Sequence, residues 1–203
     1  MAVKRGKFIV FEGLDGSGKT TQIKRLGAYF AEEGIRCIVT KEPTDGPIGV
    51  LVRNVLRGIT PLSTESLALL FAADRAEHVT RQIRHALESG THVLCDRFVY
   101  SNMAYQGMKI PLNTIAAYNE RFFTAPDLTL FIDTDPKECA RRITANRQTR
   151  EIYDDEKLAQ KIRPLYLEAF NLYRDQMPVT MIDGNLEKCD VFARLLYMIK
   201  LLL

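Results

Sequence analysis

Short apolar runs alternate with longer amphipathic segments along this chain. The apolar runs carry hydrophobic side chains at successive positions, which is typical of strands buried on both faces of a parallel sheet. Five such strands are predicted, over residues 8–11, 37–40, 92–95, 128–132 and 179–182.

The segments between these runs have apolar side chains at helical spacing, and glycine or proline marks several of their ends. In the first, Ile23, Leu26 and Phe30 form one stripe, and Gly34 supplies the stop. The predicted helices are 19–33, 47–58, 64–89, 112–123, 136–145, 154–175 and a last one capped by Asn185. Pro164 lies inside the sixth helix, where it removes a hydrogen bond and should kink or divide the element.

The strand–helix alternation predicts an α/β fold, with a doubly wound, five-stranded parallel sheet flanked by helices. The 203 residues suit a single domain spanning 1–203. Within it, the polar segment 146–155 joins two predicted helices and is interpreted as a lid.

Composition and charge narrow the classes of function. The chain is 46% hydrophobic and 26% charged, and its formal net charge of +3 does not indicate nucleic-acid binding. The stretch before the first strand is too short for a signal peptide, and the apolar tail 195–203 is interrupted by Lys200. We therefore expect a cytoplasmic protein with no membrane or nucleic-acid partner.

A phosphate-binding loop is the strongest chemical signal. Residues 13–20 fit the pattern G-x-x-x-x-G-K-[ST] between a predicted strand and a predicted helix. In such a loop, glycines let backbone N–H groups converge on phosphate oxygens, beside the positive end of the helix dipole. Lys19 is expected to reach the β- and γ-phosphates of ATP, and the Thr20 hydroxyl to ligate Mg²⁺. The expected ATP-binding residues here are Gly13, Asp15, Gly16, Ser17, Gly18, Lys19, Thr20 and Thr21.

The rest of the sequence indicates which class of phosphate-loop protein this is. A GTPase would carry an N-K-x-D motif and an ABC-type ATPase an LSGGQ-like signature, and the sequence contains neither. A small kinase with a second, acceptor site is favoured, because a lid would keep water away from the transferred phosphate. A phosphate-loop ATPase or regulatory protein, and a structural protein with a vestigial loop, remain as alternatives.

Two segments offer the groups that an acceptor nucleotide needs. Phe71 and Arg75 lie one helical turn apart, which suits a flat base bearing a carbonyl, although a core Phe beside a solvated Arg gives the same pattern. Asp96 and Arg97 follow the third strand, at the sheet edge where ligands bind in doubly wound folds. There Arg97 would hold a phosphate and Asp96 would hold Mg²⁺ through water, unless the two simply form a surface ion pair.

These segments together resemble the thymidylate kinase family, over essentially the whole chain. The resemblance implies a five-stranded parallel sheet, transfer of phosphate from Mg²⁺-bound ATP to dTMP, and usually a homodimer. Another nucleoside monophosphate or deoxynucleoside kinase on the same scaffold is the nearest alternative. The matching segments are Phe11–Gln22, Lys41–Thr44, Leu70–Arg75, Asp96–Phe98 with Ser101, Ala104–Gly107 and Pro126–Asp133.

The resemblance also implies roles for individual residues. Phe71 would stack on thymine, Arg75 would donate to a thymine carbonyl, and Tyr105 would favour a deoxyribose by crowding its 2′ position. Arg142 would pack against adenine beside the turn Asp183-Gly184-Asn185. The full acceptor-binding set is Asp15, Pro43, Phe71, Arg75, Arg97, Asn102, Tyr105 and Gln106.

Members of this family differ in where they carry a transition-state arginine. Gly16 stands where some have an arginine in the phosphate loop, so Arg147 and Arg150 in the presumed lid become the candidates, with a solvated basic loop as the alternative. The implied catalytic cations are then Lys19, Arg97, Arg147 and Arg150. Phe98 departs from the family pattern, which often has Tyr or His at this position.

Overall fold

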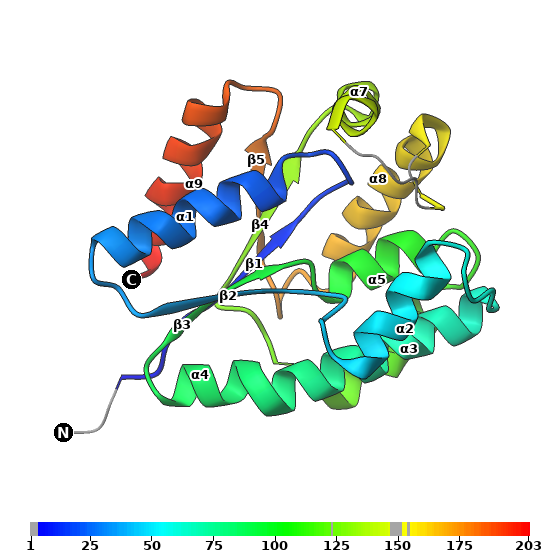
Figure 1. Ribbon diagram of the computed structural model, residues 1–203, viewed down its shortest axis with the longest axis horizontal. Helices are drawn as coiled ribbons and strands as arrows, with labels where there is room; N and C mark the ends of the chain where they lie inside the picture. Colours follow the sequence, from blue (N-terminus) through cyan, green and yellow to red (C-terminus); the bar gives the residue numbers. More distant parts are fainter. Residues whose placement is uncertain (1–3, 123, 147–151, 154) are drawn as a thin grey trace.

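Five parallel strands form one sheet with the order β2-β3-β1-β4-β5 (Figure 1). This computed structural model describes residues 4–122, 124–146, 152–153 and 155–203. The strands are β1 (Phe8–Glu12), β2 (Cys37–Lys41), β3 (His92–Asp96), β4 (Leu128–Asp133) and β5 (Val179–Asp183). The predicted α/β fold with a five-stranded parallel sheet is confirmed.

Each strand continues one residue beyond its predicted carboxyl end. The pairing extends past the last apolar side chain to a charged one, because backbone hydrogen bonds do not depend on side-chain polarity. The five added residues are Glu12, Lys41, Asp96, Asp133 and Asp183. The carboxyl edge of the sheet is therefore lined with charged groups.

The helices follow the predicted segments, with one addition and several corrections. They are α1 (Lys19–Glu32), α2 (Pro47–Leu56), α3 (Thr64–His78), η1 (Val79–Ile83), α4 (Arg84–Glu88), α5 (Val99–Gln106), α6 (Leu112–Asn119), η2 (Glu120–Phe122), α7 (Pro136–Asn146), α8 (Glu156–Leu172) and α9 (Lys188–Leu202). None of the helices in the described ranges is long and apolar enough to cross a membrane.

The two faces of the sheet are covered by different helices (Figure 1). Ile9 and Phe11 of β1 face the core that α1 and α9 close, whereas Phe8 and Val10 point to the opposite core, beneath α5 and α8. This alternation follows from the two-residue period of a strand, and it explains why β1 is apolar at every position from 8 to 11.

Two helix predictions were wrong in detail, and a third is settled in part. The segment 64–89 is not one α-helix, because the π-helical turn η1 separates α3 from α4. The segment 112–123 leaves α-helical geometry at Asn119 and continues as the 3₁₀ turn η2. Pro164 does not divide α8: the buried side chains Ile162 and Tyr166 lie on either side of it, so one apolar face continues through the proline.

Two further differences concern the start of a helix and a helix that was missed. Asn185 does not cap α9, because the cap position of this helix is Glu187. The side-chain amide oxygen of Asn185 accepts instead from the Asp135 N–H. The helix α5 has no solvent-exposed face, since all eight of its side chains are buried. A helix without an amphipathic period cannot be found from periodicity.

Candidate active site

The phosphate-binding loop and the Asp96–Arg97 pair emerge side by side. Phe11 of β1 pairs with Asp96 of β3, so the segments that follow these two strands leave the sheet at the same edge. The chain turns toward β2 after β1 and toward β4 after β3, on opposite sides of the sheet. Such a switch point creates the crevice in which doubly wound folds bind ligands.

The loop itself has the backbone conformation that its glycines allow. Gly13, Gly16 and Gly18 all have positive φ angles, and α1 begins at Lys19 immediately afterwards. A Cβ atom on Gly16 would lie 2.4 Å from the carbonyl oxygen of Cys139, so no larger residue fits this position without a shift. The predicted context of strand, glycine loop and helix is confirmed.

Lys19 is folded into the loop and is 5% exposed. Its Nζ donates to the carbonyl oxygens of Gly13 at 2.9 Å and Leu14 at 2.7 Å. Burial, with help from the nearby Arg97 guanidinium, lowers the pKa of Lys19 to about 8. The ammonium is thus held beside the loop at a free-energy cost that a bound polyanion would reduce.

Arg97 reaches the same point from the neighbouring strand. Its Nη1 donates to the Gly13 carbonyl oxygen at 3.1 Å, and its Nη2 donates to Asp15 Oδ1 at 2.8 Å. Burial lowers the pKa of Arg97, but Asp15 and nearby hydroxyls outweigh this effect, and the pKa stands well above its usual value. Lys19 and Arg97 therefore converge on one carbonyl oxygen, as two cations facing the same anion would.

Tyr105 completes this cluster. Its hydroxyl donates to Asp15 Oδ2 at 2.9 Å and accepts from Arg97 Nη2 at 3.2 Å. The Arg97 guanidinium also lies 5.0 Å from the centroid of the Tyr105 ring. Three residues predicted to contact the acceptor, Asp15, Arg97 and Tyr105, are thus in mutual contact.

Thr20 and Asp96 supply an oxygen pair at the mouth of the loop. The Thr20 hydroxyl donates to Asp96 Oδ2 at 2.7 Å. The other carboxylate oxygen, Asp96 Oδ1, is buried without a hydrogen-bond partner among the described residues. Mg²⁺ in nucleotide sites takes one or two protein oxygens and completes its shell with water and phosphate. This oxygen pair fits such an ion.

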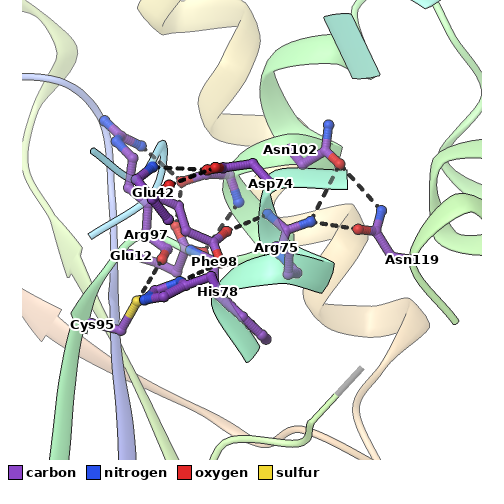
Figure 2. Close-up of polar contacts among 12 residues, drawn as sticks. Glu12, Glu42, Asp74, Arg75, His78, Cys95, Arg97, Phe98, Asn102 and Asn119 are labelled. Atoms are coloured by element: carbon purple, nitrogen blue, oxygen red, sulfur yellow. Dashed lines mark hydrogen bonds and ion pairs between the residues drawn. The ribbon is translucent and has the colours of Figure 1, made fainter. Parts of the chain in front are cut away.

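The predicted base pocket is a buried side-chain network. Arg75 is 1% exposed; its Nη2 donates to Glu42 Oε2 at 2.7 Å, and its Nη1 donates to the Asn119 amide oxygen. Figure 2 shows the guanidinium directed toward Asn102 and Asn119 on one side and Glu42 on the other. The alternative of a solvated Arg75 is therefore wrong.

The same network extends to other predicted acceptor residues. Asn102 Nδ2 donates to Gln106 Oε1 at 3.0 Å, and Gln106 Nε2 donates to the Tyr153 hydroxyl at 3.1 Å. Phe71 is half-buried against the apolar cluster formed by Val52, Val55, Leu56 and Leu67. Within the described ranges, Arg75 Nε is buried and has no hydrogen-bond partner.

The predicted adenine contacts also come together. Arg142 Nη2 donates to the Gly184 carbonyl oxygen at 3.3 Å, so the arginine and the turn 183–185 are neighbours. Gly184 lies against Thr134, where an added Cβ would sit 2.0 Å from the hydroxyl oxygen. Arg147 and Arg150 lie outside the described residues.

Sequence reasoning missed several groups that hold this site together. Glu12, His78, Asn119 and Tyr166 are all buried and bonded to predicted site residues or to their partners. His78 lies three residues after Arg75 on one helix, a spacing that could have suggested a shared face. Asn119 and Tyr166 lie on distant helices and carry no local signal.

A phosphate loop after the first strand of a parallel sheet, facing an arginine from the adjacent strand, defines a phosphate-loop kinase scaffold. The model of the family described as thymidylate kinase matches residues 11–194. The chain belongs to the thymidylate kinase family.

Relatives from archaea and bacteria match over most of their length. A probable thymidylate kinase of Pyrococcus horikoshii is 40% identical over 186 residues, which cover 89% of this chain and 90% of the relative. A probable thymidylate kinase of Methanococcus aeolicus is 45% identical, over 81% of this chain and 80% of the relative. A thymidylate kinase of a Geobacillus species is 37% identical, over 93% of both chains.

Proposed function

We propose that this chain catalyses the ATP-dependent phosphorylation of dTMP to dTDP. The observation that carries the proposal is the convergence of Lys19, from the ATP loop, and Arg97, from the acceptor side, on the carbonyl oxygen of Gly13. Cations from two separate segments meet where the ends of two polyanions would meet. The similarity to thymidylate kinases then supports dTMP as the acceptor.

In this mechanism the γ-phosphoryl group passes in line to an oxygen of the dTMP 5′-phosphate. That oxygen is already ionised at neutral pH, so positioning and charge stabilisation replace a general base. Lys19 holds the β- and γ-phosphates and Arg97 holds the acceptor phosphate. The Thr20 hydroxyl, and Asp96 through water, would hold Mg²⁺, which would supply charge neutralisation on the ATP phosphates.

Base and sugar recognition fall to the buried network. Arg75 donates to a thymine carbonyl, Phe71 stacks on the ring, and Tyr105 disfavours a 2′-hydroxyl. The remaining acceptor contacts in this proposal are Asp15, Pro43, Asn102 and Gln106. Fixed donors of this kind recognise a base strongly, because an analogue that lacks the carbonyl leaves a buried donor unpaired.

The adenine end and the lid complete the proposed active site. Arg142 packs against adenine beside Asp183, Gly184 and Asn185. The segment 146–155 acts as the lid of a single kinase domain, and its Arg147 and Arg150 stabilise the negative charge of the transition state.

We also propose a homodimer formed through α3, whose Leu69 is 47% exposed. Leu69→Lys would then shift the sedimentation coefficient toward that of a monomer.

A coupled assay of ADP release tests the proposed activity. dTMP, dUMP, dCMP, dGMP and thymidine are supplied in turn with ATP and Mg²⁺. We expect dTMP to give the highest kcat/KM, and a chelator of divalent cations to abolish the signal. Preference for another monophosphate or for thymidine would replace dTMP as the acceptor, and ADP release that is independent of every acceptor would indicate an ATPase.

A further inference from the structure

Glu12, the last residue of β1, is a fully buried carboxylate placed directly before the first glycine of the phosphate loop. Burial raises its pKa, although hydrogen bonds from Ser101 and the charge of Arg97 oppose this. An unpaired carboxylate at such a position would be costly, so its contacts explain why it is tolerated. Each of these contacts leads to the acceptor side of the site.

The first contacts are with the backbone of another segment. Glu12 Oε1 accepts from the N–H of Phe98 at 2.9 Å and from the N–H of Ser101 at 3.1 Å. These groups lie at the start of α5, where a helix leaves its first N–H groups without intrahelical partners. Phe98, at the cap position of α5, has no side-chain acceptor to satisfy them. Glu12 therefore caps α5 from strand β1.

The second carboxylate oxygen binds two hydroxyl groups. Glu12 Oε2 accepts from Ser101 Oγ at 2.5 Å and from the Tyr166 hydroxyl at 3.2 Å. Both hydroxyls in turn accept from Arg97 Nη1, at 2.8 Å and 3.1 Å. A carboxylate that orients these hydroxyls presents their oxygens to the guanidinium, which can only donate.

The backbone of Arg97 gives a reason for such support. Its φ angle is 73°, in the left-handed region that a residue with a side chain rarely adopts. A strained conformation of this kind persists when the surrounding contacts determine it. Glu12 holds the next residue, Phe98, and Figure 2 draws Glu12 together with Phe98 and Arg97.

We propose that Glu12 is a positioning residue for the acceptor phosphate: it caps α5 and aligns the Ser101 and Tyr166 hydroxyls so that Arg97 faces the phosphate loop. This inference rests on the proposed function. Because Glu12 adjoins Gly13 in the chain, it also sets the distance between the donor loop and the acceptor arginine. It does not touch either nucleotide itself.

Steady-state kinetics with ATP and dTMP varied separately test this role. Glu12→Gln keeps the shape and an oxygen for the two N–H groups, but it removes the charge that faces Arg97. We expect the KM for dTMP to rise about tenfold, the effect of weakening one charge-assisted hydrogen bond, with the KM for ATP changed less than about twofold. Equal increases in both KM values, or no change in either, would overturn the proposal.

A matched pair of tyrosine variants keeps the test valid if Glu12→Gln fails to fold. Tyr166→Phe removes a buried hydroxyl that contacts Glu12 and Arg97, whereas Tyr100→Phe removes a buried hydroxyl that donates to the Met177 carbonyl oxygen. We expect Tyr166→Phe to raise the KM for dTMP about threefold and Tyr100→Phe to leave it unchanged. Identical values for these two variants would contradict the proposed alignment of Arg97.

The double variant Glu12→Gln/Tyr166→Phe separates alignment from general stability. If both residues act through Arg97, the increase in KM for dTMP is smaller than the product of the single increases. Independent effects that multiply would argue for two unrelated structural roles. A wild-type enzyme that prefers another monophosphate would overturn the proposed function alone, because the same KM ratios can then be measured with that acceptor.

Discussion

Two arginines on the acceptor side, Arg75 and Arg97, are held in opposite ways. Arg75 is paired with Glu42, and both side chains are almost completely enclosed, at 1% and 2% exposed. The Arg97 side chain is 15% exposed. Arg97 and Lys19 both donate to the carbonyl oxygen of Gly13. Arg75 is neutralised by an enclosed carboxylate. Arg97 is paired with the more exposed carboxylate of Asp15, and it also stands beside a second cation, Lys19.

This difference matches two kinds of ligand group. A guanidinium whose charge is already balanced offers directed hydrogen bonds, which suit an uncharged base carbonyl. Neighbouring cations attract an anion, and their mutual repulsion falls when one binds. The base end, around Arg75, is thus organised by one enclosed ion pair. At the phosphate end, Arg97 and Lys19 stand side by side near the partly exposed Asp15 carboxylate, and an incoming phosphate would reduce the repulsion between the two cations.

Breaking the buried pair should have the largest effect. Arg75→Met leaves Glu42 buried without its guanidinium, and we expect the free energy of unfolding to fall by roughly 3–5 kcal/mol. The KM for dTMP should also rise far more than the KM for ATP. Thermal unfolding and steady-state kinetics measure the two effects.

A second substitution distinguishes these effects. In Arg75→Met/Glu42→Gln the uncompensated charge is gone, so much of the stability should return while dTMP binding stays weak. If affinity returned together with stability, Arg75 would be a structural residue and the base pocket would have to lie elsewhere.

Removing the cation at the phosphate end should act mainly on turnover. For Lys19→Ala we expect kcat to fall at least about a hundredfold, because a group that stabilises transition-state charge is lost. Lys24→Ala, which removes an exposed lysine from the same helix, is the matched control. Near-normal turnover of Lys19→Ala would be incompatible with the proposed mechanism.

The pH dependence of stability sharpens the contrast further. Burial lowers the pKa of Lys19 to about 8, below its ordinary value of 10.5, so this group favours the folded state above pH 10.5 and loses that contribution as the pH falls through 8. Relative to Lys19→Met, wild type should therefore gain roughly 2 kcal/mol of stability between pH 8 and pH 10. Urea titrations at several pH values test this, and a constant difference would mean that Lys19 titrates normally.

The same contrast explains what could be predicted from the sequence. The phosphate end was predictable because Gly13 to Thr20 form one contiguous motif, in which the backbone itself supplies most of the expected phosphate contacts. Arg97 and Asp96 followed from their place after a strand. The base end depends on pairs between distant segments: Asn119 has no local pattern, and α5, which carries Asn102 and Gln106, is too completely buried to show a period. Pairs between residues far apart in the sequence can be identified only from the folded structure.

A more exposed ion pair, Arg163–Asp133, gives the smallest predicted effect, although its distance matches that of Arg75–Glu42. Arg163 of α8 donates to both oxygens of Asp133, at 2.8 and 2.7 Å, yet these side chains are 37% and 24% exposed. Water solvates either charge when its partner is removed, so Arg163→Met should cost less than about 1 kcal/mol. Its effect should shrink in high salt, unlike that of Arg75→Met, because screening acts mainly on exposed charges. If both variants lost the same stability, burial would not be what distinguishes the base end of this site.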